Sequence, residues 1–170
     1  MDVLVVVDMQ KDFISGALGT KEAAAIVPRV AEKIVQAKKA GKTVVFTRDT
    51  HHENYLQTQE GKNLPVPHCI ENTPGWEIDP ALDTTGARIF DKPSFGSEEL
   101  VQYLKGLDNL TSAEFVGLCT DICVITNVLS AKCALPELPI AVDSACCAGV
   151  TPGSHENALA AMRMCQIRIL

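Results

Sequence analysis

The stretch VLVVV, Val3–Val7, is an uninterrupted apolar run made mainly of β-branched residues. Residues of this kind favour strands, and a run without polar alternation predicts a strand that is covered on both of its faces. Strands of that kind are typical of the parallel sheets in α/β proteins. Asp2 and Asp8 flank the run and no basic segment precedes it, so we expect a buried strand and not a signal peptide.

Strand-like and helix-like segments alternate along the rest of the chain. The expected strands are Val3–Val7, Thr43–Thr47, Arg88–Asp91, Ala113–Leu118, Ile140–Val142 and Gln166–Leu170. The expected helices are Lys21–Ala40, Ser97–Leu107, Thr120–Ala134 and Thr151–Met164. This alternation predicts a single doubly wound α/β domain over residues 1–170, with a mainly parallel central sheet and helices on both of its faces. The connections should be right-handed crossovers.

The composition narrows the class of protein further. The chain has 170 residues, of which 46% are hydrophobic, and both figures are typical of one globular domain with a filled core. A formal net charge of −6 argues against a nucleic-acid partner, and no apolar run approaches the roughly 20 residues that a membrane-spanning helix needs. The seven cysteines are odd in number and follow no secreted framework, so we expect reduced thiols in the cytoplasm.

Three residues that can carry chemistry follow the expected strands. Asp8 follows the first strand, Lys92 the third and Cys123 the fourth. Because sites in open α/β sheets lie beyond the carboxyl ends of the strands, we expect these side chains to meet at one edge. There a carboxylate could take the proton of a thiol, and a cation could stabilise the thiolate. Taken singly, each residue has a plainer interpretation, as a turn aspartate, a solvated lysine and a packed cysteine.

Three segments resemble motifs of the isochorismatase-like superfamily, in the order in which that family has them. Asp8–Phe13 (DMQKDF) resembles its DxQxxF opening, and Lys92–Phe95 (KPSF) resembles a compact form of its lysine segment. Gly117–Val124 (GLCTDICV) resembles its nucleophile turn, GxxTDxCV. The resemblance covers nearly the whole chain, and the last motif is the most specific. It implies a three-layer α/β/α fold and a cysteine hydrolase similar to nicotinamidases and pyrazinamidases.

The resemblance also implies a catalytic triad of Asp8, Lys92 and Cys123. In that mechanism Asp8 takes the thiol proton and Lys92 holds the charges in place. Cys123 attacks a carboxamide carbonyl, ammonia leaves, and water hydrolyses the resulting thioester. The family further suggests a cis peptide bond between Leu118 and Cys119. The backbone N–H groups of Cys119 and Cys123 would then form the oxyanion hole.

A metal site is a further implication of the resemblance. Four residues are similar to the metal ligands of the nicotinamidases in this family: Asp49, His51, Glu60 and His68. Two imidazoles with one or two carboxylates suit a divalent ion, which we expect to be Zn, with Fe(II) and Mn as alternatives. The fourth ligand is the least defined, because Glu53 and His52 are alternatives to Glu60. The plainer interpretation is a set of polar loop residues near a site.

The substrate is the feature that the sequence determines least. The resemblance implies nicotinamide or a similar small carboxamide, and Phe13 could stack on such a flat ring while Leu18 could complete an apolar wall. Pro65 replaces an aromatic residue that nicotinamidases often carry three positions before the second histidine. A metal-free cysteine hydrolase acting on another amide, such as an N-carbamoyl compound, is therefore an alternative. A non-catalytic binding protein of the same fold and a redox protein using Cys119 and Cys123 are others. The family also suggests a homo-oligomer.

Overall fold

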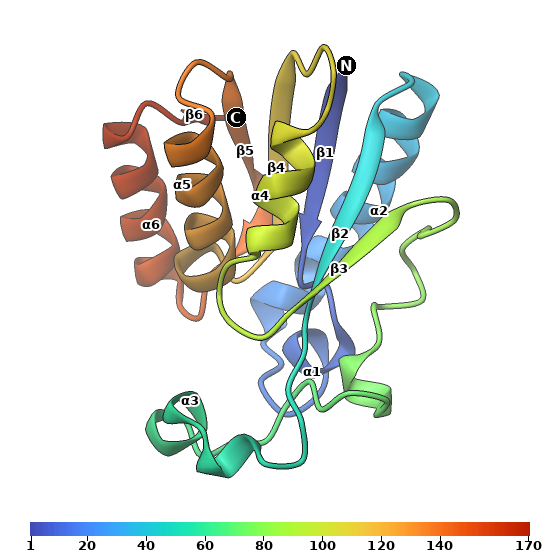
Figure 1. Ribbon diagram of the computed structural model, residues 1–170. Coiled ribbons are helices and arrows are strands. Elements are labelled where there is room, and N and C mark those ends of the chain that lie inside the picture. The colour runs from blue at the N-terminus through green and yellow to red at the C-terminus, as the bar shows by residue number, and fades with distance from the viewer.

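The six strands form one parallel sheet in the order β3-β2-β1-β4-β5-β6. The computed structural model describes the whole chain, residues 1–170. The strands are β1 Asp2–Val7, β2 Thr43–Asp49, β3 Arg88–Lys92, β4 Ser112–Leu118, β5 Ile140–Ala148 and β6 Arg168–Ile169. Helices lie on both sides of this sheet (Figure 1), which confirms the predicted doubly wound α/β fold.

The helices form the two outer layers. They are α1 Lys11–Ile14, α2 Lys21–Lys39, α3 Gln59–Asn63, α4 Glu98–Lys105, α5 Ile125–Ala134 and α6 Pro152–Met164. Single turns occur at η1 Tyr55–Gln57, η2 Pro74–Trp76 and η3 Thr120–Val124. Helix α2 covers one face of the sheet, while α4, α5 and α6 cover the other (Figure 1). The short helices α1 and α3 lie beyond the carboxyl ends of the strands, at the bottom of Figure 1.

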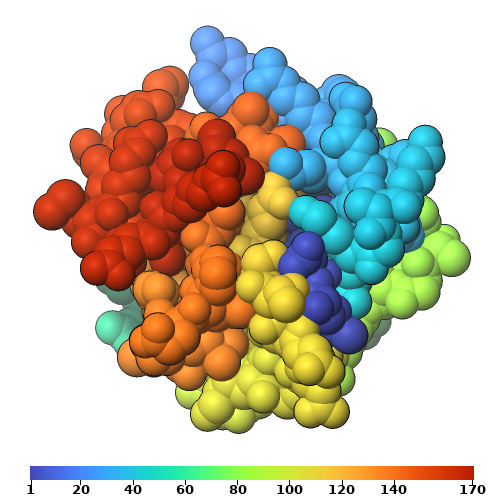
Figure 2. All heavy atoms as spheres, turned by 90° about the horizontal axis from the view of Figure 1, so that it is seen from above, coloured from blue at the N-terminus to red at the C-terminus, as the bar shows by residue number.

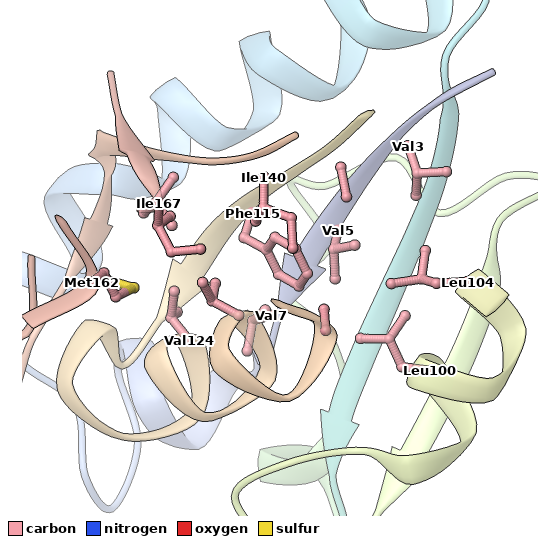
Figure 3. Packing of buried hydrophobic residues seen from close by; sticks show 14 of the residues in the cluster. Val3, Val5, Val7, Leu100, Leu104, Phe115, Val124, Ile140, Met162 and Ile167 are labelled. Carbon is pink, nitrogen blue, oxygen red and sulfur yellow. The ribbon is translucent and has the colours of Figure 1, made fainter. Parts of the chain in front are cut away.

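Strand β1 is packed from both sides. Side chains alternate across a strand, so its valines at odd positions face one helical layer while Leu4 and Val6 face the other. Val3, Val5 and Val7 pack with residues of α4, α5 and α6 (Figure 3). Leu4 and Val6 pack with residues of α2. All five side chains are at most 1% exposed, and complete burial of such a side chain stabilises a fold by roughly 1.5–3 kcal/mol.

Most elements differ from the sequence prediction by one or two residues at their ends, and three further differences concern β5, β6 and the start of α5. Strand β5 runs past the predicted Val142 to Ala148, because Asp143, which ends the apolar pattern, is paired with Lys33 of α2. Strand β6 is limited to Arg168–Ile169, since it pairs with β5 through only two residues at the edge of the sheet. The predicted helix over 120–134 begins as a π turn before α5.

At the end of the sheet where the strands begin, the first residue of the chain is bonded to the segment before β4. The Met1 ammonium group donates to the Asn109 carbonyl oxygen over 2.6 Å and to the Thr111 hydroxyl over 3.0 Å. Figure 2 shows the start of the chain, in dark blue, beside the yellow segment that leads into β4. The residues that can carry chemistry, Asp8, Lys92 and Cys123, lie at the opposite end, where the strands end. No helix of the fold combines the length and the apolar character needed to cross a membrane.

The order of the strands reverses between β1 and β4, and ligands of open α/β sheets bind at such a reversal. The two strands approach closely here. Gly117 of β4 pairs with Val7 of β1 and has a φ of 118°. A Cβ atom on Gly117 would lie 2.1 Å from the Val7 carbonyl oxygen. Only glycine therefore allows this approach, one residue before Asp8 and two before Cys119.

We expect Gly117→Ala to lower the free energy of unfolding by about 2 kcal/mol or more, because alanine disfavours this φ and its methyl group meets backbone atoms. Gly41→Ala is the matched control. Gly41 has a φ of 73° but no atom within 4 Å of the added Cβ, so we expect a loss of only about 1 kcal/mol. Urea unfolding followed by circular dichroism measures both losses. Equal losses would contradict the importance of the contact with Val7.

Candidate active site

The ends of three strands bring Asp8, Lys92 and Cys123 together, as the sequence predicts. Lys92 Nζ lies 2.7 Å from Asp8 Oδ2 and donates to Cys123 Sγ over 3.5 Å. All three residues are buried. Asp8 has a φ of 46°, and a residue other than glycine adopts such a left-handed conformation at a cost of about 1–3 kcal/mol. Backbone conformations of this kind are concentrated at functional sites.

The Lys92 ammonium group is the centre of this cluster. It also donates to Asp49 Oδ1 over 3.2 Å and to the Ser94 carbonyl oxygen over 2.9 Å. Burial alone would lower the pKa of Lys92, but the neighbouring carboxylates and thiol outweigh burial and hold this pKa above its usual value. Lys92 is therefore protonated, and its charge compensates that of the buried carboxylates around it.

Burial acts in the opposite direction on Cys123 and Asp8. It raises the pKa of the Cys123 thiol, and the Asp8 carboxylate raises it further. Burial also raises the pKa of Asp8, although Lys92 and the Thr47 hydroxyl, which donates to Asp8 Oδ1 over 2.7 Å, oppose this increase. The resting thiol is thus neutral and lies beside a carboxylate with increased proton affinity. A carboxylate of this kind is a better acceptor for the thiol proton.

Cys123 lies in the π turn Thr120–Val124 at the end of β4. The peptide bond between Leu118 and Cys119, just before this turn, is cis, as the resemblance implies. Cys119 and Cys123 both line the same pocket. The role of their backbone N–H groups as an oxyanion hole stays a prediction.

Two side chains attach this turn to the start of α6. Thr120 Oγ1 lies 2.8 Å from His155 Nδ1. The Asp121 carboxylate accepts the backbone N–H of Val150 over 3.1 and 3.2 Å. The residues next to Cys123 are therefore held by contacts to a segment that is about 30 residues away in the sequence.

A second cluster lies next to the first. It contains the four predicted metal ligands: Asp49, His51, Glu60 and His68. One ligand atom of each residue lies within 4.8 Å of the others. Asp49 belongs to both clusters, since its Oδ1 accepts from Lys92 while its Oδ2 lies 2.9 Å from His51 Nε2. His52 and Glu53, the alternatives to Glu60, are exposed and lie outside this cluster.

The chemistry of the second cluster fits a divalent metal ion. His51 Nε2 is buried and has no hydrogen-bond partner, although carboxylate oxygens of Asp49 and Glu60 lie 2.9 and 3.5 Å away. His68 Nδ1 lies 2.8 Å from the Val66 carbonyl oxygen, which leaves His68 Nε2 as the nitrogen available to a metal. Two imidazoles and two carboxylates suit Zn, Fe(II) or Mn.

The two carboxylates favour a positive charge at this point. Burial lowers the pKa of His51, but Asp49 and Glu60 outweigh burial and raise this pKa to about 9. Burial also acts to raise the pKa of Asp49, yet the nearby imidazoles of His51 and His68 and the Lys92 ammonium group hold it well below its usual range. A proton on His51 therefore supplies the charge that a bound cation would supply in its place.

Both clusters open into one pocket of about 340 Å³. Phe13 and Leu18, the predicted substrate contacts, line it together with Asp49 and Cys123. The Phe13 ring lies 5.5 Å from the His68 ring, so an aromatic wall adjoins the second cluster. No lysine or arginine is among the 15 residues that line the pocket. Its volume is at the lower end of the range of small-molecule sites.

Two residues of the site have no predicted role in the sequence. Gln10 is completely buried, and its side chain bonds to both the N–H and the carbonyl oxygen of Asp49, at 2.7 and 2.8 Å. Its position within the DMQKDF motif is a signal that could have revealed it. Tyr55 packs against both histidines, with ring centroids 4.7 Å from His51 and 5.1 Å from His68. No signal in the irregular sequence around Tyr55 indicates this contact.

The fold and the site together define a class of protein. Buried reactive groups surround a pocket at the point where the strand order of a parallel α/β sheet reverses. This is the arrangement of α/β enzymes that act on small molecules.

Comparison with known proteins defines this class further. The family model of the isochorismatase domain matches residues 2–169. The nicotinamidase/pyrazinamidase of Mycobacterium tuberculosis is 28% identical to this chain in an alignment that covers 100% of this chain and 98% of that protein. The crystal structure of the pyrazinamidase of Pyrococcus horikoshii in complex with zinc is 32% identical and superposes with a TM-score of 0.87 over 99% of this chain and 98% of that chain.

N-carbamoylsarcosine amidase from Thermoplasma acidophilum shares the fold, with a TM-score of 0.83 at 22% identity over 99% of this chain and 94% of that chain. The chain belongs to the isochorismatase family and is a hydrolase of that family. The family and the nicotinamidase relatives together indicate an amidohydrolase acting on C–N bonds.

Proposed function

We propose that the protein hydrolyses nicotinamide, or a similar small carboxamide, to the acid and ammonia through a thioester on Cys123. The observation that carries this proposal is that the first cluster, with Cys123, and the second cluster, with the two histidines, open into a single pocket. A carboxamide group beside Cys123 and a ring nitrogen beside the histidines could thus belong to one small molecule. The nicotinamidase and pyrazinamidase relatives support this substrate class.

In the proposed reaction Asp8 accepts the proton of the Cys123 thiol as the sulfur attacks the carbonyl carbon. The backbone N–H groups of Cys119 and Cys123 stabilise the oxyanion. The C–N bond then breaks, and the nitrogen leaves as ammonia with the proton from Asp8. Water next gives a proton to Asp8 and attacks the thioester, the C–S bond breaks, and the sulfur recovers its proton.

We propose that Asp49, His51, Glu60 and His68 hold a divalent metal ion. When bound, such an ion supplies a Lewis acid that can orient a ring nitrogen of the substrate. The protein supplies the rest of the pocket. Phe13 offers an aromatic face to a flat ring and Leu18 offers an apolar wall. Tyr55 packs on both histidine rings and restricts their orientation.

The charge of the pocket favours a neutral substrate over the N-carbamoyl alternative. Amides such as N-carbamoyl amino acids carry a carboxylate, and no lysine or arginine lines the pocket to receive it. Asp49 and Glu60 line it instead, so in the metal-free site of that alternative a substrate carboxylate meets like charges. The thiol-redox alternative is also disfavoured, because burial raises the pKa of Cys119 to about 12, whereas redox thiols have a lowered pKa.

We expect the wild-type protein to release ammonia from nicotinamide, and we expect removal of metal by a chelator to abolish this activity. Adding back Zn, Mn or Fe(II) one at a time should restore it and identify the ion. An N-carbamoyl amino acid is the comparison substrate, and coupled ammonia detection measures both. If only the N-carbamoyl compound were hydrolysed, the nicotinamide assignment would be wrong, while the cysteine hydrolase would stand.

The metal site has a test that does not depend on activity. We expect His51→Ala to lose most of its bound metal, as measured by plasma mass spectrometry after gentle purification, because one of four ligands is removed. His52→Ala is the matched control, since His52 is the neighbouring histidine but is exposed and outside the cluster. It should keep the wild-type metal content. Equal metal contents in the two variants would contradict the assignment of His51 as a ligand.

A further inference from the structure

Asn127 of α5 is a completely buried polar side chain that the proposed reaction does not use. A buried amide destabilises a fold unless its hydrogen bonds are made, and here all are made to backbone groups. Its Oδ1 accepts the N–H of Ser97 over 3.0 Å. Its Nδ2 donates to the Cys123 carbonyl oxygen over 2.8 Å and to the Phe95 carbonyl oxygen over 3.1 Å.

These partners lie on two separate segments. One is the turn that carries Cys123, and the other is the connection between β3 and α4, which begins directly after Lys92. Lys92 itself donates to the Ser94 carbonyl oxygen in that connection. Asn127 therefore joins the backbone of Cys123 to the connection between β3 and α4, and Lys92 contacts the same connection. Phe95 additionally lines the pocket, so the same amide places part of the pocket wall.

The other partners of Lys92 do not make this link. Asp8 follows β1 and Asp49 ends β2, so both ion pairs hold the ammonium group from the side of those strands. The contact with Cys123 Sγ, at 3.5 Å, is the longest of the Lys92 contacts. It depends on how the turn after β4 sits against the connection after β3. Among side-chain amides, only that of Asn127 bonds to both of these segments.

We propose that Asn127 is a positioning residue that holds the connection after Lys92 in register with Cys123, and so keeps the Lys92 ammonium group beside the sulfur. This inference rests on the proposed function, because it takes Cys123 as the nucleophile. An aliphatic residue would leave the Ser97 N–H and the Phe95 and Cys123 carbonyl oxygens without this partner. The buried amide instead fixes one arrangement of two segments that carry reacting groups.

Two variants test this role. Asn127→Leu has a similar branched shape and removes all three hydrogen bonds, while Asn127→Asp keeps an acceptor for Ser97 and removes both donors. Two rates are measured: kcat for nicotinamide, and alkylation of Cys123 by iodoacetamide followed by peptide mass spectrometry. We expect both rates to fall roughly 10- to 100-fold, because small displacements of reacting groups have effects of this size. KM should change far less than kcat.

Lys33→Met is the control for loss of stability alone. Lys33 pairs with Glu114 and Asp143, in the part of β4 and β5 away from Cys123. This variant should melt at a lower temperature with unchanged alkylation of Cys123. If the Asn127 variants lost only stability and kept both wild-type rates, the positioning role would be wrong. If Asn127→Leu does not fold, the rates of Asn127→Asp alone decide the question. Alkylation needs no substrate, so this result is separate from a failure of the nicotinamide assignment.

Discussion

Cys123→Ala is expected to lower kcat/KM for nicotinamide by at least about 10⁴-fold, the scale on which removal of a covalent nucleophile acts. Without the sulfur no thioester can form, and the pocket can only bind the amide. The fold should persist, because the substitution removes a single buried sulfur atom and leaves the Lys92–Asp8 ion pair in place. Steady-state ammonia release and the melting temperature are the two measurements.

Cys133→Ala is the matched control for this prediction. Cys133 is an exposed thiol on α5, outside the pocket, so the variant should keep wild-type activity. Iodoacetamide should inactivate the wild type and Cys133→Ala alike. A Cys123→Ala protein that kept most of its activity would overturn the assignment of the nucleophile and, with it, the thioester route.

Asp8→Asn is expected to lower kcat by about 10³-fold, within the range for loss of a general base. The amide keeps the shape of the side chain and can still accept from Thr47, but it cannot take the thiol proton. It also leaves the Lys92 ammonium group with Asp49 as its remaining carboxylate partner. Circular dichroism and thermal melting should therefore accompany the kinetic measurement, since removing one partner of a buried ion pair costs about 3–5 kcal/mol.

The same carboxylate predicts the pH dependence of the wild-type enzyme. Asp8 acts in its ionised form, and burial raises its pKa. Activity should therefore fall with decreasing pH at a value above the usual aspartate pKa of about 3.9. Asp2→Asn is the matched control at the other end of β1, where Asp2 contacts Thr111 and Ser112; it should leave kcat unchanged. Wild-type activity in Asp8→Asn would show that another group accepts the proton.

The sequence by itself determined the fold class and the place of the site. The VLVVV run and its successors predict parallel strands because apolar patterns along a strand are local. The carboxyl ends of parallel strands share one edge of the sheet, so the positions of Asp8, Lys92 and Cys123 after their strands predict that the three side chains lie close together. The resemblance of the motif around Cys123 to the nucleophile turn of the family implies the cis bond before Cys119, which the structure has.

The tertiary structure decided what local patterns leave open. The sequence favours Glu60 as the further ligand but leaves His52 and Glu53 open, and the packing of α3 brings Glu60 to the histidines. Likewise, nothing in the sequence near Asn127 indicates that its amide joins Cys123 to residues about 30 positions earlier. Such contacts link segments that are far apart in the chain, so their geometry is set by how the sheet and the helices pack together, and no local pattern records it.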